Sequence, residues 1–106
     1  MMNQMQLFNP AETMKQDVLV AVKQLTNAWR ARRYPQNPHG NGQNRAHFAV
    51  RWETDDPEGP ATLIFWSPAH HGRAAGFEFV NRYATAKALL ADVESRTAGI
   101  CSLWLA

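Results

Sequence analysis

Apolar side chains recur at steps of three and four positions in the first part of the chain, which is the spacing of one face of an α-helix. The pattern begins at Asn-Pro-Ala-Glu, where Asn9 can cap a helix, Pro10 fits its first position and Glu12 completes a capping box. Tyr34 precedes a proline, which disfavours helical backbone, so the helix is predicted to end near Arg33. Its apolar stripe consists of Met14, Val18, Ala21, Val22, Leu25 and Trp29.

A loop rich in Pro, Gly and Asn follows, and after it apolar and polar residues alternate, as they do in β-strands. The alternation places Phe48, Val50 and Trp52 on one face of a first strand. The turn residues DDPEGP come next, and then ATLIFWS at 61–67, which is apolar on both faces. These two segments are predicted to form a β-hairpin.

The sequence GFEFV restores the alternation, with Phe77 and Phe79 pointing the same way, and indicates a third strand. Asn81 is placed to cap a second helix, and Gly99 stands where a left-handed residue commonly ends one. The apolar stripe of that helix consists of Tyr83, Ala86, Leu89, Leu90 and Val93. ICSLWLA at 100–106 is predicted to be a short terminal strand.

The resulting order is α-β-β-β-α-β, an α+β fold in which two helices pack on one face of an antiparallel sheet of three to four strands. The last strand would follow a right-handed crossover and run parallel to its neighbour, beside either the first or the third strand. A chain of 106 residues with 45% hydrophobic and 19% charged residues suits one globular domain. We expect residues 1–8 to be a flexible N-terminus and residues 9–106 to form that domain.

Targeting and cysteine usage favour a cytoplasmic protein. The N-terminus lacks a basic segment followed by an apolar run, and no apolar stretch approaches membrane-spanning length. Cys101 is the single cysteine, so neither an internal disulfide nor a zinc site of paired cysteines can form. The arginines outnumber the lysines eight to three, which with the many alanines suggests a GC-rich bacterial or phage genome.

Arginines cluster where the first helix is predicted to end. Cations in the last helical turn interact favourably with the helix dipole, by about 0.3–1 kcal/mol each at exposed sites, and this alone accounts for Arg30, Arg32 and Arg33. Alternatively, they form a phosphate-binding surface with Arg45 and Arg51. The net charge of +2 is small for a dedicated nucleic-acid-binding protein.

The element order up to the second helix is similar to that of double-stranded RNA-binding domains. That family places basic residues at the start of its second helix and uses the loop between its first two strands for contact. Here the loop is DDPEGP, with three acids, and the helix region opens NRYATAK. The resemblance is therefore topological only, and it assigns no role to any residue.

His70 and His71 are the best candidates for catalysis or metal binding. Neighbouring residues on a strand point to opposite sides, however, and no second ligand follows at helical spacing. Ser67 lacks the Gly-x-Ser-x-Gly elbow of a hydrolase nucleophile. The sequence thus predicts exposed loop histidines, no catalytic residue, no metal ligand and no cofactor. An enzyme that depends on the two histidines is a distant third hypothesis.

Four tryptophans are many for this length, and most of them are expected in the core. The segments that carry Trp66 and Trp104 nevertheless offer more apolar surface than two helices on one face can cover. Either the chain termini and the long loop cover the rest of the sheet, or part of it is an interface with a partner protein or with a second copy in a homodimer.

We therefore expect a small, non-enzymatic regulator that binds another protein and blocks it sterically. One example is an antiactivator, or an anti-defence inhibitor of a nucleic-acid-handling machine. The predicted contact residues are Arg30, Arg32, Arg33, Arg45, Arg51, Trp66 and Trp104. The alternative is direct nucleic-acid binding through the arginines at 30–51.

Overall fold

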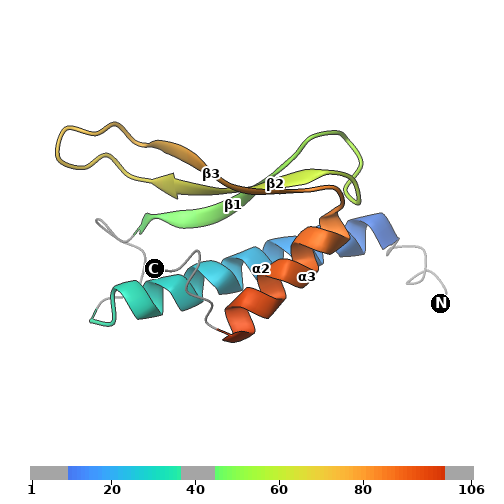
Figure 1. The fold of residues 1–106 in the computed structure, drawn as a ribbon, viewed down its shortest axis with the longest axis horizontal. Helices are drawn as coiled ribbons and strands as arrows, with labels where there is room; N and C mark the ends of the chain where they lie inside the picture. The colour runs from blue at the N-terminus through green and yellow to red at the C-terminus, as the bar shows by residue number, and fades with distance from the viewer. Residues whose placement is uncertain (1–9, 37–44, 100–106) are drawn as a thin grey trace, which may run out of the picture.

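The computed structural model describes residues 10–36 and 45–99 of the chain. Over these residues a long helix, three consecutive antiparallel strands and a shorter helix follow one another (Figure 1). The elements are α2 (Pro10–Arg33), β1 (His47–Trp52), β2 (Ala61–Ser67), β3 (Gly76–Tyr83) and α3 (Ala86–Gly99). Both helices lie on the same side of the sheet, so the predicted α+β fold is confirmed.

The predicted stripe of α2 is the buried side of that helix. Pro10 is the first helical residue, and the N–H of Tyr34 closes the last turn by donating to the carbonyl of Arg30 at 2.7 Å. The helix thus ends at Arg33, where the proline rule placed its end. Its buried residues are Val18, Ala21, Val22, Leu25, Thr26 and Trp29, and Met14 is half-buried.

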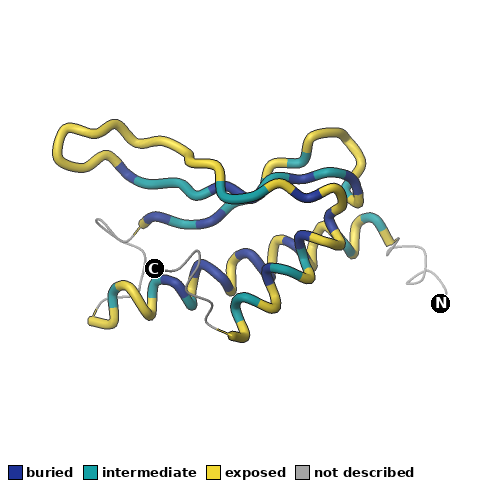
Figure 2. The backbone as a smooth tube through the Cα atoms, in the orientation of Figure 1, coloured by how far each residue is buried: buried dark blue, intermediate teal, exposed yellow. Residues whose placement is uncertain are grey.

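The central strand of the sheet is β2, which pairs antiparallel with both neighbours. Its register with β1 sets Phe65 opposite Phe48 and Leu63 opposite Val50. These side chains belong to the core between the sheet and the helices, where the tubes are dark or teal in Figure 2. Leu63 is 0% exposed because β1 and β3 flank it and the helices cover its side of the sheet.

Aromatic rings complete the core at the C-terminal end of α2. The ring of Trp29 meets those of Phe65, Tyr34 and Phe48 with centroid separations of 5.0, 5.8 and 6.4 Å, each edge to face. This geometry sets the positive edge of one ring against the negative face of another. Trp29 is buried, so the expectation that most tryptophans serve the core holds for this one.

The predicted start of the second helix is wrong. Asn81 and Tyr83 belong to β3, where they pair with Leu63 and Ala61 of β2. Pairing with the apolar central strand β2 extends β3 to Tyr83. Between Phe79 and Asn81 the strand contains one extra residue, a bulge that reverses the alternation, so the Tyr83 side chain faces the core. The helix is instead capped by Thr85, whose hydroxyl accepts from the N–H of Ala88 at 3.1 Å.

The predicted stripe of α3 is otherwise correct, with Ala86, Leu89 and Val93 buried and Leu90 half-buried. The helix ends at Gly99, but this residue does not adopt the left-handed backbone expected of it. The predicted N-terminal segment 1–8, Asn9 and the terminal strand at 100–106 lie outside the described residues, as does Trp104. Neither helix in the described part of the chain is long and apolar enough to cross a membrane.

A buried hydrogen bond ties the edge strand β1 to α2. The N–H of Phe48 donates to the hydroxyl of Thr26 at 2.9 Å, and both residues are buried. The N–H of Phe48 points away from β2, and a buried main-chain donor without a partner is costly. The Thr26 hydroxyl therefore stabilises the fold by accepting this hydrogen bond.

Leu63→Ala should lower the free energy of unfolding by about 2–5 kcal/mol, because it leaves a cavity among atoms that cannot collapse into it. Val20→Ala is the control, since Val20 is 54% exposed and its loss should change stability by about 0.5 kcal/mol or less. Urea unfolding of the three proteins measures both values. Equal stability of the two variants would contradict the core position of Leu63.

Thr26→Val should lower the free energy of unfolding by about 1–3 kcal/mol, although it preserves the side-chain shape. The cause is the unpaired N–H of Phe48, and hydrogen exchange of that amide should accelerate by more than its neighbours do. Exchange at Phe48 that remains as slow as in the parent would show that the Thr26 hydroxyl is not its partner.

Candidate functional site

The face of the sheet that points away from the helices, here called the outer face, is covered by no described element (Figure 1). Its composition follows from the register. Trp66 stands opposite His47 on one side and Phe77 on the other, and Ile64 stands between Ala49 and Phe79.

The half of the outer face near the β2–β3 turn is apolar. We call it the aromatic half, and it consists of Ala49, Ile64, Trp66, Phe77 and Phe79. Phe77 is 55% exposed and Phe79 is 69% exposed, whereas Ile64 between the neighbouring strands is only 7% exposed. Two phenylalanines held on one face by strand alternation, with this much surface in water, form an apolar patch that the described chain does not bury.

Trp66 is shielded at one side of this patch. The His47 ring lies 5.3 Å from it between centroids, and the Arg45 guanidinium is centred 6.0 Å from it, within reach of a cation–π contact. The tryptophan is therefore half-buried rather than freely displayed. Trp66, Arg45 and His47 together form a rim that combines apolar surface with positive charge.

The other half of the outer face is polar and internally bonded. Arg82 donates to both carboxylate oxygens of Glu53, at 2.6 and 3.0 Å, and Thr62 donates to the same group at 3.4 Å. The hydrogen bond from Arg82 lowers the pKa of Glu53 below its usual value. The Glu53 carboxylate is therefore paired with the Arg82 guanidinium. This half of the outer face, which we call the polar half, is held by charged hydrogen bonds, whereas the aromatic half is apolar.

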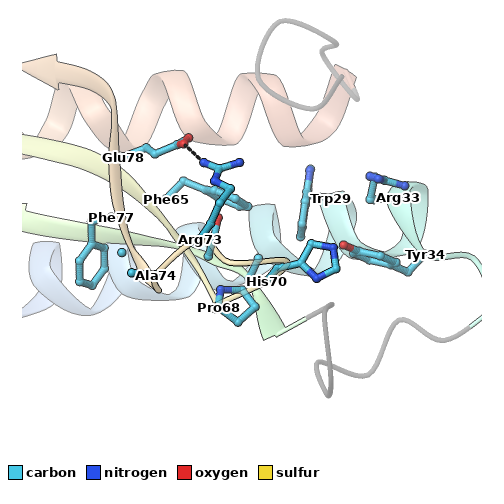
Figure 3. A pocket seen from close by; sticks show the side chains of 13 residues that line it. Trp29, Arg33, Tyr34, Phe65, Pro68, His70, Arg73, Ala74, Phe77 and Glu78 are labelled. Carbon is cyan, nitrogen blue, oxygen red and sulfur yellow. Dashed lines mark ion pairs between the residues drawn. The ribbon is translucent and has the colours of Figure 1, made fainter.

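The chain folds so that arginines distant in sequence meet at one end of the molecule. The end of α2, the start of β1 and the β2–β3 turn lie at the same end of the molecule (Figure 1). Arg33 and Arg73 line one cavity there (Figure 3), and the carbonyl of Arg45 accepts from Arg30 of α2. Arg51 does not belong to this group, since it stands opposite Thr62 in the polar half. The predicted five-residue basic surface is thus only partly assembled.

The arginines of this basic end differ in what they do. Arg30 donates from Nε to the carbonyl of Ala46 at 3.3 Å and from a terminal nitrogen to that of Arg45 at 3.2 Å, so it fastens the start of β1 to the helix. Arg33 is exposed and lies 5.2 Å from the Tyr34 ring. Arg32 is exposed as well.

An open cavity of about 550 Å³ lies between the end of α2 and the β2–β3 turn (Figure 3). Trp29 and Phe65 line its apolar part, while Arg33, His70 and the Arg73–Glu78 pair stand around it. That ion pair is 3.9 Å long and its side chains are 81% and 64% exposed, so it is weak in water.

The β2–β3 turn carries His70 and His71, and both are exposed, as predicted. His70 and Arg73 bond to each other through both N–H groups, at 3.0 and 2.9 Å, and the residues between them, His71 and Gly72, have φ values of 48° and 82°. These are features of a tight type I′ hairpin turn. The exposed His70 and His71 rings lie 3.7 Å apart instead of on opposite sides. No group of three or more potential metal ligands occurs within residues 10–36 and 45–99.

Comparison with protein-family models finds no matching family, and comparisons with curated proteins and with solved structures find no match either. The site must therefore be interpreted from its own chemistry. Sequence reasoning placed Phe77 and Phe79 on a common side but did not single them out, and it overlooked Arg73. The sequence shows that Phe77 and Phe79 occupy alternate positions, but only the fold shows whether the side they share faces the core or the solvent.

Arg30→Ala should lower the free energy of unfolding by about 1 kcal/mol or more, because it removes charge-assisted bonds to two carbonyls. The double variant Arg32→Ala/Arg33→Ala should change it by less, since it removes only exposed dipole interactions. Thermal and urea unfolding compare the two. A larger loss in the double variant would contradict the structural role given to Arg30.

Proposed function

We propose that this chain is a small regulator that binds another protein through the aromatic half of its outer face and blocks that protein sterically. The supporting observation is the exposure of Phe77 and Phe79 on a sheet face that no described element covers. Exposed aromatic residues on a rigid strand lose little conformational entropy on binding, which makes them effective anchors.

The surroundings of the patch define the partner's chemistry. Arg45 and His47 flank it through Trp66, and Arg73 follows beyond Phe77 along the hairpin. A complementary surface has an apolar centre for the phenylalanines and carboxylates at its margin for the arginines. We propose that the partner presents such an acidic-rimmed apolar patch, as one subunit interface of a nucleic-acid-handling machine would.

Steric regulation requires no reactive group on this chain, since an occupied interface prevents its owner from dimerising or engaging its substrate. An antiactivator or an anti-defence inhibitor acts in this way. Bacterial or phage origin and a cytoplasmic location remain predictions from the sequence.

Single-stranded nucleic acid is the second candidate ligand. Flat rings on an open sheet with arginines beside them can stack bases while the cations hold phosphates. Arg73, which the fold adds to Arg33 and Arg45, favours this alternative, whereas the small net charge of +2 favours the protein partner.

Phe77→Thr/Phe79→Thr should abolish specific partner capture, because it deletes both anchors while keeping residues suited to a strand. Leu19→Gln/Val20→Gln is the matched control, since these residues are 42% and 54% exposed on α2, away from the outer face. Tagged proteins are used to capture partners that mass spectrometry identifies, and affinity is then measured with the purified partner. The first variant should bind about 100-fold more weakly or worse, and the control as tightly as the parent.

The same proteins titrated with fluorescent single-stranded oligonucleotides at two salt concentrations distinguish the second candidate. Binding that falls with salt at a slope of about 0.7 per phosphate contacted, and that the phenylalanine variant loses, would favour nucleic acid over a protein partner. Equal partner affinity of the phenylalanine variant and the control would exclude the aromatic half as the contact surface.

A further inference from the structure

Within residues 10–36 and 45–99, β1 and β3 are the edge strands of the sheet, because β2 is central. Edge strands carry unpaired N–H and C=O groups, and proteins usually protect them. On β1 the Thr26 hydroxyl accepts from Phe48. Near the end of β3, the Asn81 side chain accepts from the N–H of Arg82 at 3.0 Å. The described residues provide no comparable cover for β3 between Gly76 and Phe79, where every residue is exposed.

The alternation of hydrogen-bonded pairs along the strands shows which main-chain N–H and C=O groups of β3 point away from β2. At the far end of the first hairpin, the N–H of Glu53 donates to the carbonyl of Pro60 at 2.9 Å. Hydrogen-bonded pairs alternate along antiparallel strands, so Phe65 and Ser67 turn their bonding groups toward β3 and meet Glu78 and Gly76.

Phe77 and Phe79 therefore direct their main-chain N–H and C=O groups away from β2, toward the open edge. Their side chains project from the outer face, and their backbone offers a short template for another strand.

We propose that a second copy of this chain occupies this edge, with β3 pairing antiparallel to its counterpart about a two-fold axis at Phe77. Two copies would then join their sheets into one of six strands. The distal part of the hairpin rises away from the helices in Figure 1, so neither helix stands in front of this edge segment.

Self-pairing of this segment has a preferred register. If the axis passed through Glu78, the two Glu78 carboxylates would face each other, and like charges directly opposite are unfavourable. With the axis at Phe77, the two Phe77 residues exchange their main-chain hydrogen bonds, and each Glu78 faces Gly76 of the second copy. Apart from the two chain neighbours of Gly76, no described residue has an atom within 4 Å of the place a Cβ would take there.

A second copy fits this edge because residues 76–79 can pair with themselves in a register that does not set one Glu78 carboxylate against the other. The pairing also sets the aromatic halves of both copies side by side, and so enlarges the surface proposed to bind a partner. It does not depend on that proposal, because it uses the backbone of β3 and not the rings.

The test separates backbone pairing from ring contacts. Phe77→Pro deletes an N–H that points to the open edge, and proline is tolerated at such edge positions, so β3 keeps its bonds to β2. Phe77→Ala deletes the same ring but keeps the N–H. Light scattering coupled to size exclusion, over a range of concentrations, should give a dimer mass for the parent and for Phe77→Ala and a monomer mass for Phe77→Pro. Circular dichroism verifies that each variant is folded.

A second pair of variants tests the register and keeps the proposal falsifiable if the proline variant unfolds. Gly76→Lys sets a lysine against Glu78 of the second copy, and Gly76→Glu sets a carboxylate there. The lysine variant should dimerise about tenfold more tightly, or more, than the glutamate variant. A parent that is monomeric at every concentration, monomeric Phe77→Ala, or equal dimer affinity of the two Gly76 variants would overturn the proposal.

Discussion

The packing of α2 and α3 against each other and against one face of the sheet is the contact on which the rest of this structure depends. Leu63 at the centre of the sheet and Leu25 and Leu89 on the two helices are all 0% exposed. A strand flanked by neighbours in its own plane has only two faces to cover, and both helices occupy the same one. Because β2 is apolar on both faces, this packing leaves apolar side chains on the other face in water.

Some of the apolar side chains on the outer face are shielded from water, and others are not. Ile64 is buried between its strand neighbours, and Trp66 is shielded by Arg45 and His47. No described strand lies beyond the phenylalanines of β3, and they remain exposed. The binding surface we propose is therefore a direct consequence of the edge position of β3 in the described part of the sheet, whose helices lie on one side.

Charge is distributed by the same topology. The end of α2, the start of β1 and the β2–β3 turn lie at one end of the molecule, and that end carries Arg33, Arg45 and Arg73. The acidic turn DDPEGP lies at the other end of β1. The net charge of +2 conceals this separation. A ligand that meets the aromatic half thus meets cations at its margin, which is the basis for assigning carboxylates to the partner.

The sequence alone determined the long helix, the three described strands and the grouping of side chains on their faces, because periods of 3.6 and 2 are local properties of the backbone. It predicted α2 from its stripe and its Tyr-Pro end, and the common side of Phe77 and Phe79. Tertiary structure decided the rest. Pairing with β2 drew Asn81 and Tyr83 into a strand where local signals favoured a helix cap, and only the position of the helices made one face of β2 core and the other a surface. Both depend on contacts between distant residues, which no local pattern records.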